Sequence, residues 1–497
     1  MAPIDSGRPA LGGIHRHTKA GKSARDLSSK GPSLDHPQAT EKCTMSSLSE
    51  YAALKAQVLS SLDRYESALK EGKLSEPSLN GMQMHETDNP AYLASKNFWD
   101  SRDVLVAALG ALKNTVQSPA TRLSELSLAH HISAALQVAV RANAADQLAA
   151  AGPQGLPATD LAKAVGLQPA KLTKILRFLA NMNIFNEVTE GVFANNRASS
   201  LLVTSNPVRD FVSWQTKFSL QTAPQVADNL FDPKKGLSFD PLDAAVGTTY
   251  QIRESGHTDM WARMAELTDM SEFARAMSAF GDAGNPGWIA DYPWDSLGDT
   301  TLVDVGGGHG ALTLPLLQAF PHFKAVIQDR REVEGAYKTH FEQKLPEALS
   351  SNRVKFEVYD FFNDVQPHKG DGFTYMMRWI LHDWPDHKCE IILKLIAAAM
   401  SPKSKLIIVD TILQPASIVP KDAKPADLIH ASVWPLPRSQ GAAGQLKMNV
   451  DFEMMQALNA TERTPKDFDR ILNAAGLKRI GMYKCRAQSD VIEAMLA

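Results

Sequence analysis

The chain has 497 residues, 44% of them hydrophobic and 22% charged, which predicts two or three globular domains with a large buried core. Its formal net charge of -3 argues against general electrostatic binding to nucleic acid, and no apolar run is long enough to predict a transmembrane helix. Three cysteines without CxxC spacing exclude a disulfide framework or a structural zinc cluster and favour a reducing, cytoplasmic environment.

The first part of the chain, residues 1–46, is predicted to be a disordered tail. It is basic and rich in serine, as a transit peptide can be, but its prolines and glycines would interrupt an amphipathic helix. It also lacks the apolar core of a secretory signal. From Ser47 onward apolar residues recur every three or four positions, so we expect a helical domain over residues 47–285.

A winged-helix-like segment is predicted within this domain, over about residues 135–205. Thr159 is expected to cap a short helix, a second helix follows, and "FNEVTEGVFANN" has the pattern of two strands joined by a turn. In a DNA-binding protein the second helix would contact the bases. Its only cations here are Lys171, Lys174 and Arg177, so we expect a role in packing or dimerisation instead.

An alternation of short apolar strands and helical stretches begins near Gly287 and predicts a second domain over residues 286–497. Strands are expected in "TLVDVGG", "KAVIQD", "VKFEVYD", "GFTYMMRW" and "KLIIVDTIL". This alternation is typical of a parallel sheet built from βαβ units. The C-terminal segments "KRIGMYKCR" and "SDVIEAML" could close the sheet as an antiparallel pair.

Four glycines within residues 306–310 connect the first of these strands to a helix. Glycine allows a tight turn and lets a ligand approach the backbone without a Cβ clash. The pattern loosely satisfies the dinucleotide-binding motif, so it is compatible with a nicotinamide cofactor. Asp329, at the end of the next strand, does not separate the alternatives, because both candidate cofactors present a ribose diol.

Two other carboxylates favour S-adenosylmethionine over a nicotinamide dinucleotide. Asp304 lies inside the first strand, two residues before the glycines, where it could face an ammonium group. Asp360 follows the third strand and precedes Phe361 and Phe362, so a carboxylate and aromatic faces could receive an adenine. A ligand with a cationic amino-acid end and an adenosine end matches both features.

The segment "RWILHDWPDH", residues 378–387, allows three interpretations. A metal site is disfavoured, because its two histidines are five residues apart in a proline-containing turn and no third ligand has a recognisable spacing. A solvated polar loop is the second possibility. The third is a catalytic base at the carboxyl end of a strand, where α/β sheets hold their ligands.

The segments "VDVGGGHG", "VIQDR", "VYDFF", "RWILHDWPDH", "IIVDTIL" and "NATERTPKDF" resemble, in order and spacing, plant and fungal S-adenosylmethionine-dependent O-methyltransferases of the caffeate O-methyltransferase type. The resemblance begins near residue 50. It implies a cation-independent (class I) enzyme with a C-terminal Rossmann-like, seven-stranded methyltransferase domain and an N-terminal all-α, winged-helix dimerisation domain. It further implies a homodimer that binds S-adenosylmethionine and methylates a hydroxyl of a small aromatic or phenolic secondary metabolite, without metal, nucleic acid or membrane partners.

The resemblance assigns the general base to His382. The chemistry agrees, because imidazole can accept a phenolic proton near neutral pH, and an apolar pocket favours the charge-quenching methyl transfer. Asp410 and Glu462 are expected to flank the histidine, although plant enzymes usually carry glutamate at the first of these positions. With the shorter aspartate, the contact could instead pass through Asp383, whose other interpretation is a helix cap.

Cofactor binding is assigned by the same resemblance to Asp304, Gly306, Gly307, Gly308, Asp329, Asp360, Phe361 and Arg378. Arg378 has the alternative interpretation of an exposed cation at a strand end. Met277 and Met454 are expected to contact the substrate, whereas other methionines such as Met376 and Met377 are expected in the core. Residues 415–445 form a proline-rich insertion relative to the plant enzymes and are expected to be a mobile loop beside the site.

Two alternative functions are left open. One is a catalytically inactive, cofactor-binding regulator that contacts DNA through the winged helix; the other is a nicotinamide-dependent reductase. His382 together with Asp410 and Glu462 favours the methyltransferase, as does the sparse basic charge on the second helix of the winged-helix segment. Only the loose glycine pattern favours the reductase.

Overall fold

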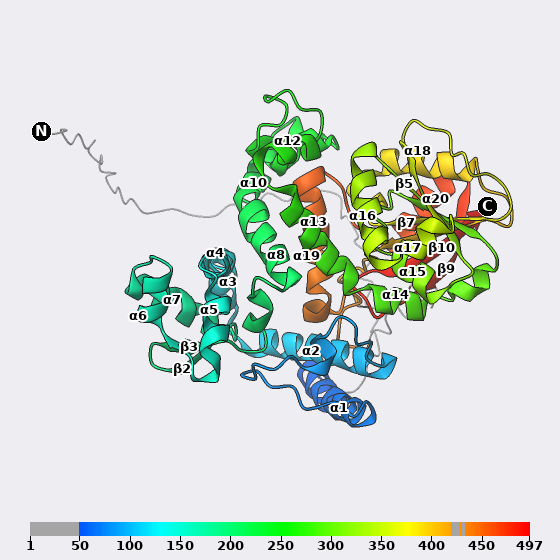
Figure 1. Ribbon diagram of the computed structural model, residues 1–497. Coiled ribbons are helices and arrows are strands. Elements are labelled where there is room, and N and C mark those ends of the chain that lie inside the picture. The colour runs from blue at the N-terminus through cyan, green and yellow to red at the C-terminus, as the bar shows by residue number, and fades with distance from the viewer. Residues whose placement is uncertain (1–48, 419–427, 430–432) are drawn as a thin grey trace, which may run out of the picture. The chain divides into compact units, whose positions relative to one another are not determined.

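The computed structural model describes residues 49–418, 428–429 and 433–497 (Figure 1). The tail predicted over residues 1–46 lies outside the described residues, and so does much of the insertion predicted over residues 415–445. The described residues contain a helical part followed by an α/β part, in the order predicted from the sequence.

The described part of the chain starts with two long helices that pack on each other. Ser49 caps the first, its hydroxyl accepting a hydrogen bond from the Ala52 N–H, and Gly72 follows the last turn. Leu54 and Ala107 are buried between the two helices. The first five helices are α1 (Glu50–Glu71), α2 (Lys96–Val116), α3 (Pro119–Ser127), α4 (His130–Arg141) and α5 (Ala144–Ala151).

The predicted winged-helix segment is present. It comprises β1 (Leu156–Pro157), α6 (Ala158–Ala164), α7 (Pro169–Ala180), β2 (Asn186–Thr189) and β3 (Val192–Ala194), with the antiparallel strand order β1-β3-β2. The prediction that Thr159 caps α6 is wrong, because Pro157 occupies the cap and makes no side-chain cap bond. Arg177, one of the three cations of α7, is paired with Glu187 of β2 at 2.6 Å. This pair ties helix to strand and favours a packing role for α7.

The next helices are short and rich in aromatic residues. Trp214, Phe218, Met264 and Ala276 are buried in one cluster, and Leu458 joins it from a helix much later in the chain. Figure 1 shows this late helix, α19, in orange among the green helices. None of the helices in the described ranges is both long enough and apolar enough to span a lipid bilayer. The helices of this part are α8 (Pro207–Trp214), α9 (Leu220–Thr222), α10 (Gln225–Phe231), α11 (Ala245–Thr249), α12 (Met260–Leu267), α13 (Met270–Asp282), α14 (Asn285–Asp291) and α19 (Gln445–Leu458).

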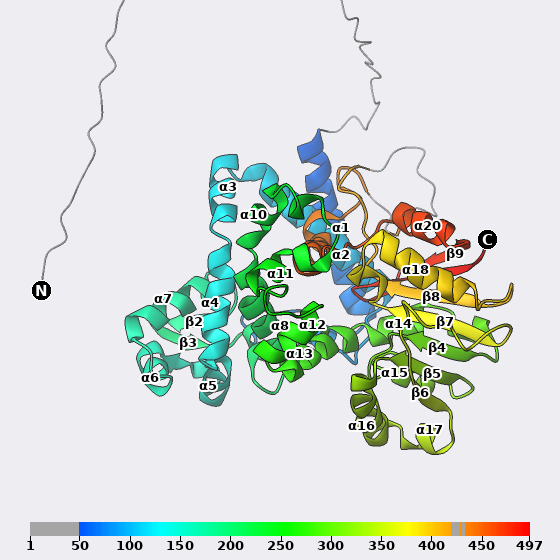
Figure 2. The same cartoon turned by 90° about the horizontal axis from the view of Figure 1, so that it is seen from above.

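A seven-stranded sheet organises the C-terminal part, which confirms the predicted Rossmann-like fold. Its order is β6-β5-β4-β7-β8-β10-β9; the first five strands in this order are parallel, and β10 is antiparallel to both neighbours (Figure 2). The chain builds β4, β5 and β6 toward one edge and then returns to β7 beside β4. In α/β sheets such a reversal creates a ligand crevice at the carboxyl ends of the strands. The strands are β4 (Thr301–Val305), β5 (Lys324–Asp329), β6 (Val354–Val358), β7 (Phe373–Arg378), β8 (Lys405–Asp410), β9 (Leu477–Tyr483) and β10 (Asp490–Leu496).

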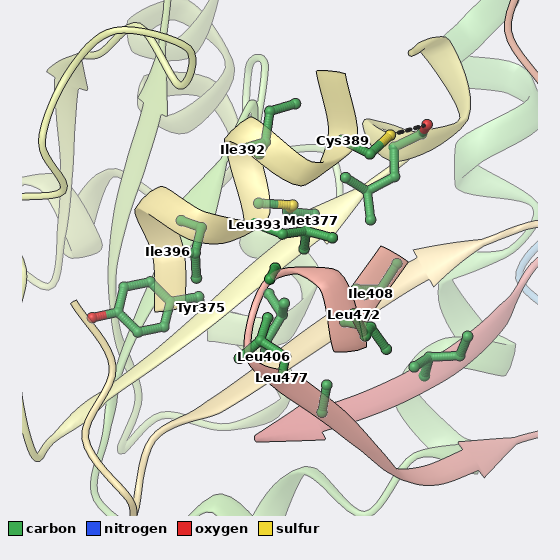
Figure 3. Close-up of a cluster of buried hydrophobic side chains, with 14 of the residues drawn as sticks. Tyr375, Met377, Cys389, Ile392, Leu393, Ile396, Leu406, Ile408, Leu472 and Leu477 are labelled. Atoms are coloured by element: carbon green, nitrogen blue, oxygen red, sulfur yellow. Dashed lines mark hydrogen bonds between the residues drawn. The ribbon is translucent and has the colours of Figure 1, made fainter. Parts of the chain in front are cut away.

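Helices cover both faces of this sheet. Side chains alternate between faces along a strand, so Met377 and Ile408 join one core cluster while Met376 and Ile407 join the other. Figure 3 shows the first cluster, in which Cys389 and its neighbours on one helix face the strands. Both methionines are fully buried, as predicted. The covering helices are α18 (Asp386–Ala397) and α20 (Pro465–Ala474) for the first cluster, and α14, α15 (Thr313–Ala319), α16 (Glu334–Lys344) and α17 (Pro346–Ser350) for the second.

Candidate active site

Two loops meet at the point where the strand order reverses. The glycine loop follows β4 at Gly306, and a 3₁₀ turn (Leu381–Asp383) comes shortly after β7. Since β4 and β7 are adjacent and parallel, both loops lie at the same edge of the sheet. A Cβ atom on Gly306 would lie 2.4 Å from Cδ1 of Ile380, so the two loops are in close contact.

The first loop requires glycine for conformational and steric reasons. Gly306 and Gly308 have φ angles of 72° and 59°. A Cβ on Gly307 would lie 2.5 Å from the carboxylate of Asp304, so the backbone passes directly over that side chain. Gly308 donates its N–H to Oδ2 of Asp329 at 2.8 Å, and among the described residues no atom lies within 4 Å of its Cβ position. The loop is thus fixed in place but open to a ligand on that side.

Asp304 is a buried carboxylate beneath the loop. Its Oδ2 accepts a hydrogen bond from the Thr313 hydroxyl at 2.5 Å. Burial raises the pKa of Asp304 to about 6, against the opposing effects of the Thr313 hydroxyl and the Arg378 charge. A carboxylate in this state is stabilised by a cationic partner, so it fits the ammonium group of S-adenosylmethionine.

Arg378 is enclosed at the end of β7, and the interpretation as an exposed cation is wrong. Its guanidinium lies 4.6 Å from the ring centroid of Trp379 and 5.6 Å from that of Trp288. Among the described residues, its buried Nη1 has no hydrogen-bond acceptor. Burial lowers the pKa of Arg378, while Asp304 acts in the opposite direction. A buried donor without an acceptor fits an anionic ligand group such as a carboxylate.

The remaining predicted cofactor residues follow β6. Both carboxylate oxygens of Asp360 are held, one by the Asn363 side chain at 2.8 Å and the other by the Phe362 N–H at 2.9 Å, which helps to lower the pKa of Asp360. The rings of Phe361 and Phe362 are 4.9 Å apart, and Trp384 meets Phe362 edge-on at 4.6 Å. Trp384 was not among the predicted residues, although it directly follows the histidine–aspartate pair. These aromatic faces and the carboxylate fit an adenosine.

His382 has a carboxylate at each ring nitrogen. Its Nδ1 lies 2.8 Å from Oε1 of Glu462, whose side chain is fully buried, and its Nε2 lies 3.4 Å from Oδ1 of Asp383. Burial alone would lower the pKa of His382, but Asp383, Glu462 and Asp410 outweigh it and raise the pKa to about 10. Burial also raises the pKa of Asp383, to about 6, although the charge of His382 opposes this shift.

Of the two predicted flanking acids, only Glu462 is hydrogen-bonded to His382. Asp410 turns to the backbone, where its Oδ1 accepts the N–H of Trp379 at 3.0 Å. The Asp410 side chain is one methylene shorter than that of glutamate. The second carboxylate at the His382 ring is that of Asp383, which is the alternative considered for a shorter side chain. Burial raises the pKa of Asp410 to about 7, and when it is ionised its charge helps to raise the pKa of His382. The interpretation of Asp383 as a helix cap is wrong, because α18 begins at Asp386 with Pro385 at the cap.

Sequence reasoning missed the residues that hold this arrangement in place. Oδ1 of Asp451, on α19, accepts hydrogen bonds from the Glu462 N–H at 2.8 Å and from the Thr461 hydroxyl at 3.0 Å. Arg463, next to Glu462, is buried and reaches the turn that carries His382. Asp451 lies eleven residues from Glu462 in an amphipathic helix, so no local pattern identified it. Arg463 could have been noticed as a cation beside a predicted catalytic acid.

A cleft of about 600 Å³ adjoins the turn. Its walls include Trp384 and Pro385 from the turn, Leu242 and Trp261 from the helical part, and Leu458 from α19. Met277 and Met454, the predicted substrate contacts, lie partly buried in the same apolar cluster as Trp261 and Leu458 but do not line the cleft. Within the part of the chain that the structure describes, no group of three or more metal-binding side chains is present.

Known proteins similar to this chain identify its family. The O-methyltransferase domain family matches residues 293–478, and the O-methyltransferase dimerisation domain family matches residues 124–205. O-methyltransferase gedA of Aspergillus terreus is 32% identical over 82% of this chain and 88% of its own length. O-methyltransferase tpcA of Aspergillus fumigatus is 30% identical over 82% of this chain and 89% of its own length.

A solved structure extends the comparison to the fold. LepI in complex with SAM matches with a TM-score of 0.63 at 19% identity, over 80% of this chain and 94% of LepI. This likeness concerns the fold alone, whereas the two fungal relatives cover most of both chains at 30% identity or more. The chain therefore belongs to the S-adenosylmethionine-dependent O-methyltransferases, the family that its motifs resemble.

Proposed function

We propose that this enzyme methylates a hydroxyl group of a small phenolic metabolite, with His382 as the general base and Glu462 as the residue that orients it. The observation that carries the proposal is the 2.8 Å contact between Nδ1 of His382 and Oε1 of Glu462, on a turn beside the glycine loop. With Nδ1 engaged by Glu462, Nε2 is the nitrogen that accepts the proton of the acceptor hydroxyl.

The cofactor is held by the residues at the carboxyl ends of β4 to β7. When bound, S-adenosylmethionine supplies an electrophilic methyl group on a sulfonium centre. The loop of Gly306, Gly307 and Gly308 would approach the cofactor through its backbone, Asp304 would hold the ammonium group, and Arg378 would donate from an Nη1 that has no acceptor among the described residues. The remaining contacts, to the adenosine, come from Asp329, Asp360 and Phe361.

The carboxylates around His382 determine how readily this residue accepts a proton. The raised pKa of His382, about 10, is close to that of a phenol, also about 10, so the neutral imidazole accepts the proton at little free-energy cost. Proton transfer leaves the acceptor as a phenolate, the nucleophile for the methyl group that S-adenosylmethionine would supply when bound. Forming the O–CH3 bond and breaking the S–CH3 bond would leave a neutral ether and S-adenosylhomocysteine, so two opposite charges would disappear. Apolar surroundings favour such a step because they stabilise neutral products relative to separated ions. Trp261, Trp384 and Leu458, which line the adjoining cleft, contribute such surroundings.

The acceptor is proposed to be aromatic because of the side chains around the turn. Trp261 and Trp384 contribute flat apolar faces to the adjoining cleft, which is large enough for a drug-sized ligand. Met277 and Met454 belong to the apolar cluster that also contains Trp261, and they are proposed to contact the acceptor deeper in this cluster. Unbranched methionine side chains adapt to a planar ring.

The domain assignment and assembly follow the sequence prediction. We assign the helical domain to residues 47–285, with the winged-helix segment at about 135–205, and the methyltransferase domain to residues 286–497. A homodimer through the helical domain is supported by the dimerisation family match at residues 124–205. Exposed apolar side chains on α1 to α3 could take part: Tyr51, Leu59, Leu62, Val106, Leu109, Val116, Leu123 and Leu126. A cytoplasmic location accords with the buried free thiols of Cys389 and Cys485.

The proposal is tested with S-adenosylmethionine labelled in the methyl group and a panel of phenols. We expect His382→Ala to lower kcat by about 10²- to 10⁴-fold, the usual contribution of a general base. His322→Ala is the matched control, because His322 is exposed just before β5, at the edge of the sheet opposite to the carboxyl ends of the strands. Calorimetry should detect S-adenosylhomocysteine binding to both variants and no NADPH binding. Undiminished turnover by His382→Ala would remove His382 from the role of base.

A further inference from the structure

Arg463 is one of the largest fully buried side chains in the described part of the protein, and it follows directly after Glu462. A guanidinium carries five N–H donors and is charged at every physiological pH. Burying it without acceptors would cost several kcal/mol, so its partners indicate what holds it there.

All five donors of Arg463 have acceptors. Nη1 donates to the carbonyl oxygen of Leu381 at 2.6 Å and to that of Thr461 at 3.4 Å. Nη2 donates to the carbonyl oxygen of Trp384 at 2.7 Å and to Oδ1 of Asp386 at 2.9 Å, and Nε donates to the same Oδ1 at 3.0 Å. The carbonyls of Leu381 and Trp384 stand immediately before His382 and immediately after Asp383. The guanidinium therefore holds the backbone on both sides of the His382–Asp383 dipeptide, which carries the base.

Neighbouring side chains also stabilise this arrangement of the turn and the guanidinium. The thiol of Cys389 lies 3.2 Å from the Leu381 carbonyl and 3.3 Å from the Trp384 carbonyl, and it stays a protonated donor because burial raises the pKa of Cys389 to about 12. Asp386 is held from its other side by Arg470, at 2.5 Å between Nη2 and Oδ2. Arg470 is largely exposed and, within the described residues, pairs with the carboxylates of Asp386 and Asp467.

The backbone of Arg463 is also fixed. Its carbonyl oxygen accepts the N–H of Leu413 at 2.9 Å, and the residue pairs with Ile412 in an isolated bridge just after β8. Asp451 holds the preceding residue through the Glu462 N–H. One short segment, anchored on both sides, thus supplies the carboxylate that meets the imidazole and the guanidinium that meets the surrounding backbone.

We propose that Arg463 is a positioning residue for methyl transfer, which fixes the backbone of the His382–Asp383 turn so that the imidazole meets Glu462 and the acceptor hydroxyl together. The inference rests on the proposed function, since it takes His382 as the base. Misplacement of a reacting group by about 1 Å can cost a factor of about 10² in rate. A lysine at position 463 keeps the positive charge but cannot donate to two carbonyls in a fixed fork.

Arg463→Lys and Arg470→Lys form a matched pair, because both arginines contact Asp386 but only Arg463 contacts the turn. We expect Arg463→Lys to lower kcat by about 30- to 100-fold, while the KM for S-adenosylmethionine and the Kd for S-adenosylhomocysteine change less than about twofold. Arg470→Lys should leave kcat within about twofold of the wild type. A wild-type kcat for Arg463→Lys would overturn the proposal, and so would a loss of kcat matched by an equal loss of cofactor affinity.

A double-variant cycle with Glu462→Gln separates positioning from general stability. If Arg463 and Glu462 both act through the imidazole, the double variant should be no more than about threefold slower than Glu462→Gln alone. Fully multiplicative losses would overturn the proposal. If Arg463→Lys does not fold, Asp386→Asn tests the proposal instead, because it removes the carboxylate that holds the Arg463 guanidinium. We expect this variant to have a several-fold lower kcat. An unchanged kcat would contradict the proposal.

His382→Ala, measured beside these variants, keeps the two hypotheses apart. Wild-type activity in His382→Ala would remove the base and with it the premise of a positioning role. An inactive His382→Ala combined with a wild-type kcat for Arg463→Lys would overturn the positioning role alone and leave the proposed function standing.

Discussion

Nε2 of His382, the nitrogen proposed to receive the proton of the acceptor hydroxyl, lies 3.4 Å from Oδ1 of Asp383. With Glu462 at Nδ1, the ring is surrounded by negative charge and binds a proton well above neutral pH. The acceptor-free enzyme therefore holds an imidazolium, and the base must be deprotonated before it can act. This requirement links the geometry of the turn to the pH dependence of the reaction.

Activity is expected to rise with pH through the neutral range. Because the pKa of His382 is raised to about 10, the neutral fraction of the imidazole increases about tenfold per pH unit between about pH 7 and pH 9. Asp383→Asn removes one of the charges that raise this pKa, so the ascending limb of kcat should shift to lower pH. The measurement is kcat against pH at saturating substrates, with His322→Ala as a control whose profile should follow the wild type. A limb that stays in place or moves upward in Asp383→Asn would contradict the assignment.

The two predicted flanking acids should differ in their effect on catalysis. Glu462 contacts the imidazole, whereas Asp410 holds the backbone N–H of Trp379. Glu462→Gln should therefore lower kcat by at least about tenfold more than Asp410→Asn does, because the amide oxygen of asparagine can still accept the Trp379 N–H. Steady-state kinetics of the two variants decide the question. Equal losses would indicate that the charge of Asp410 matters as much as the contact of Glu462.

Strand and loop positions were predictable because they depend on local patterns. Short apolar runs identified the strands that carry Asp304 and Arg378, and four clustered glycines identified the loop between β4 and α15. The pairing of His382 with Glu462 was also predicted, but only through family resemblance, since 80 residues separate the two. No local spacing brings such residues together; the strand order of the sheet does.

Side-chain direction accounts for the outcomes at Asp383 and Asp410, for which the sequence left alternatives open. Asp383 turns to His382 because helix α18 begins three residues later, behind Pro385. Asp410 turns to the Trp379 N–H, a partner that exists only once β7 and β8 are paired. Both choices depend on tertiary contacts, which a motif does not encode. Arg463 was missed for the same reason, because its acceptors are backbone carbonyls of another loop.

Removal of His382 should also change how the free energy of unfolding depends on pH. Burial raises the pKa of Asp383 to about 6 and that of Asp410 to about 7, so ionising these groups opposes folding unless a cation is near. His382→Ala removes that cation. The folded wild type also holds a proton on His382, whose pKa rises from an ordinary value of about 6.5 to about 10 on folding, and the variant lacks this stabilising contribution. The stability difference between the two proteins should therefore be larger at about pH 7 than at about pH 10.

Chemical denaturation at the two pH values measures this effect. The sign follows from linkage: a histidine whose pKa is raised on folding stabilises the native state fully below its unfolded pKa, and this stabilisation is lost as pH rises through its folded pKa. His387→Ala, at an exposed position of the same segment, should show the wild-type pH dependence. A stability difference that is constant with pH would mean that the proton on His382 does not compensate the two buried carboxylates.

The glycine loop offers a direct test of cofactor binding. In Gly307→Ala the new methyl group would lie 2.5 Å from the Asp304 carboxylate, so either the loop or the aspartate must move. Both belong to the proposed cofactor site, and we expect S-adenosylhomocysteine affinity to fall by at least about tenfold, as measured by calorimetry. Gly335→Ala is the matched control, since its Cβ would meet no atom within 4 Å among the described residues and its position in α16 favours alanine by up to about 1 kcal/mol. If Gly307→Ala binds the cofactor product as tightly as Gly335→Ala does, the loop does not form the cofactor site.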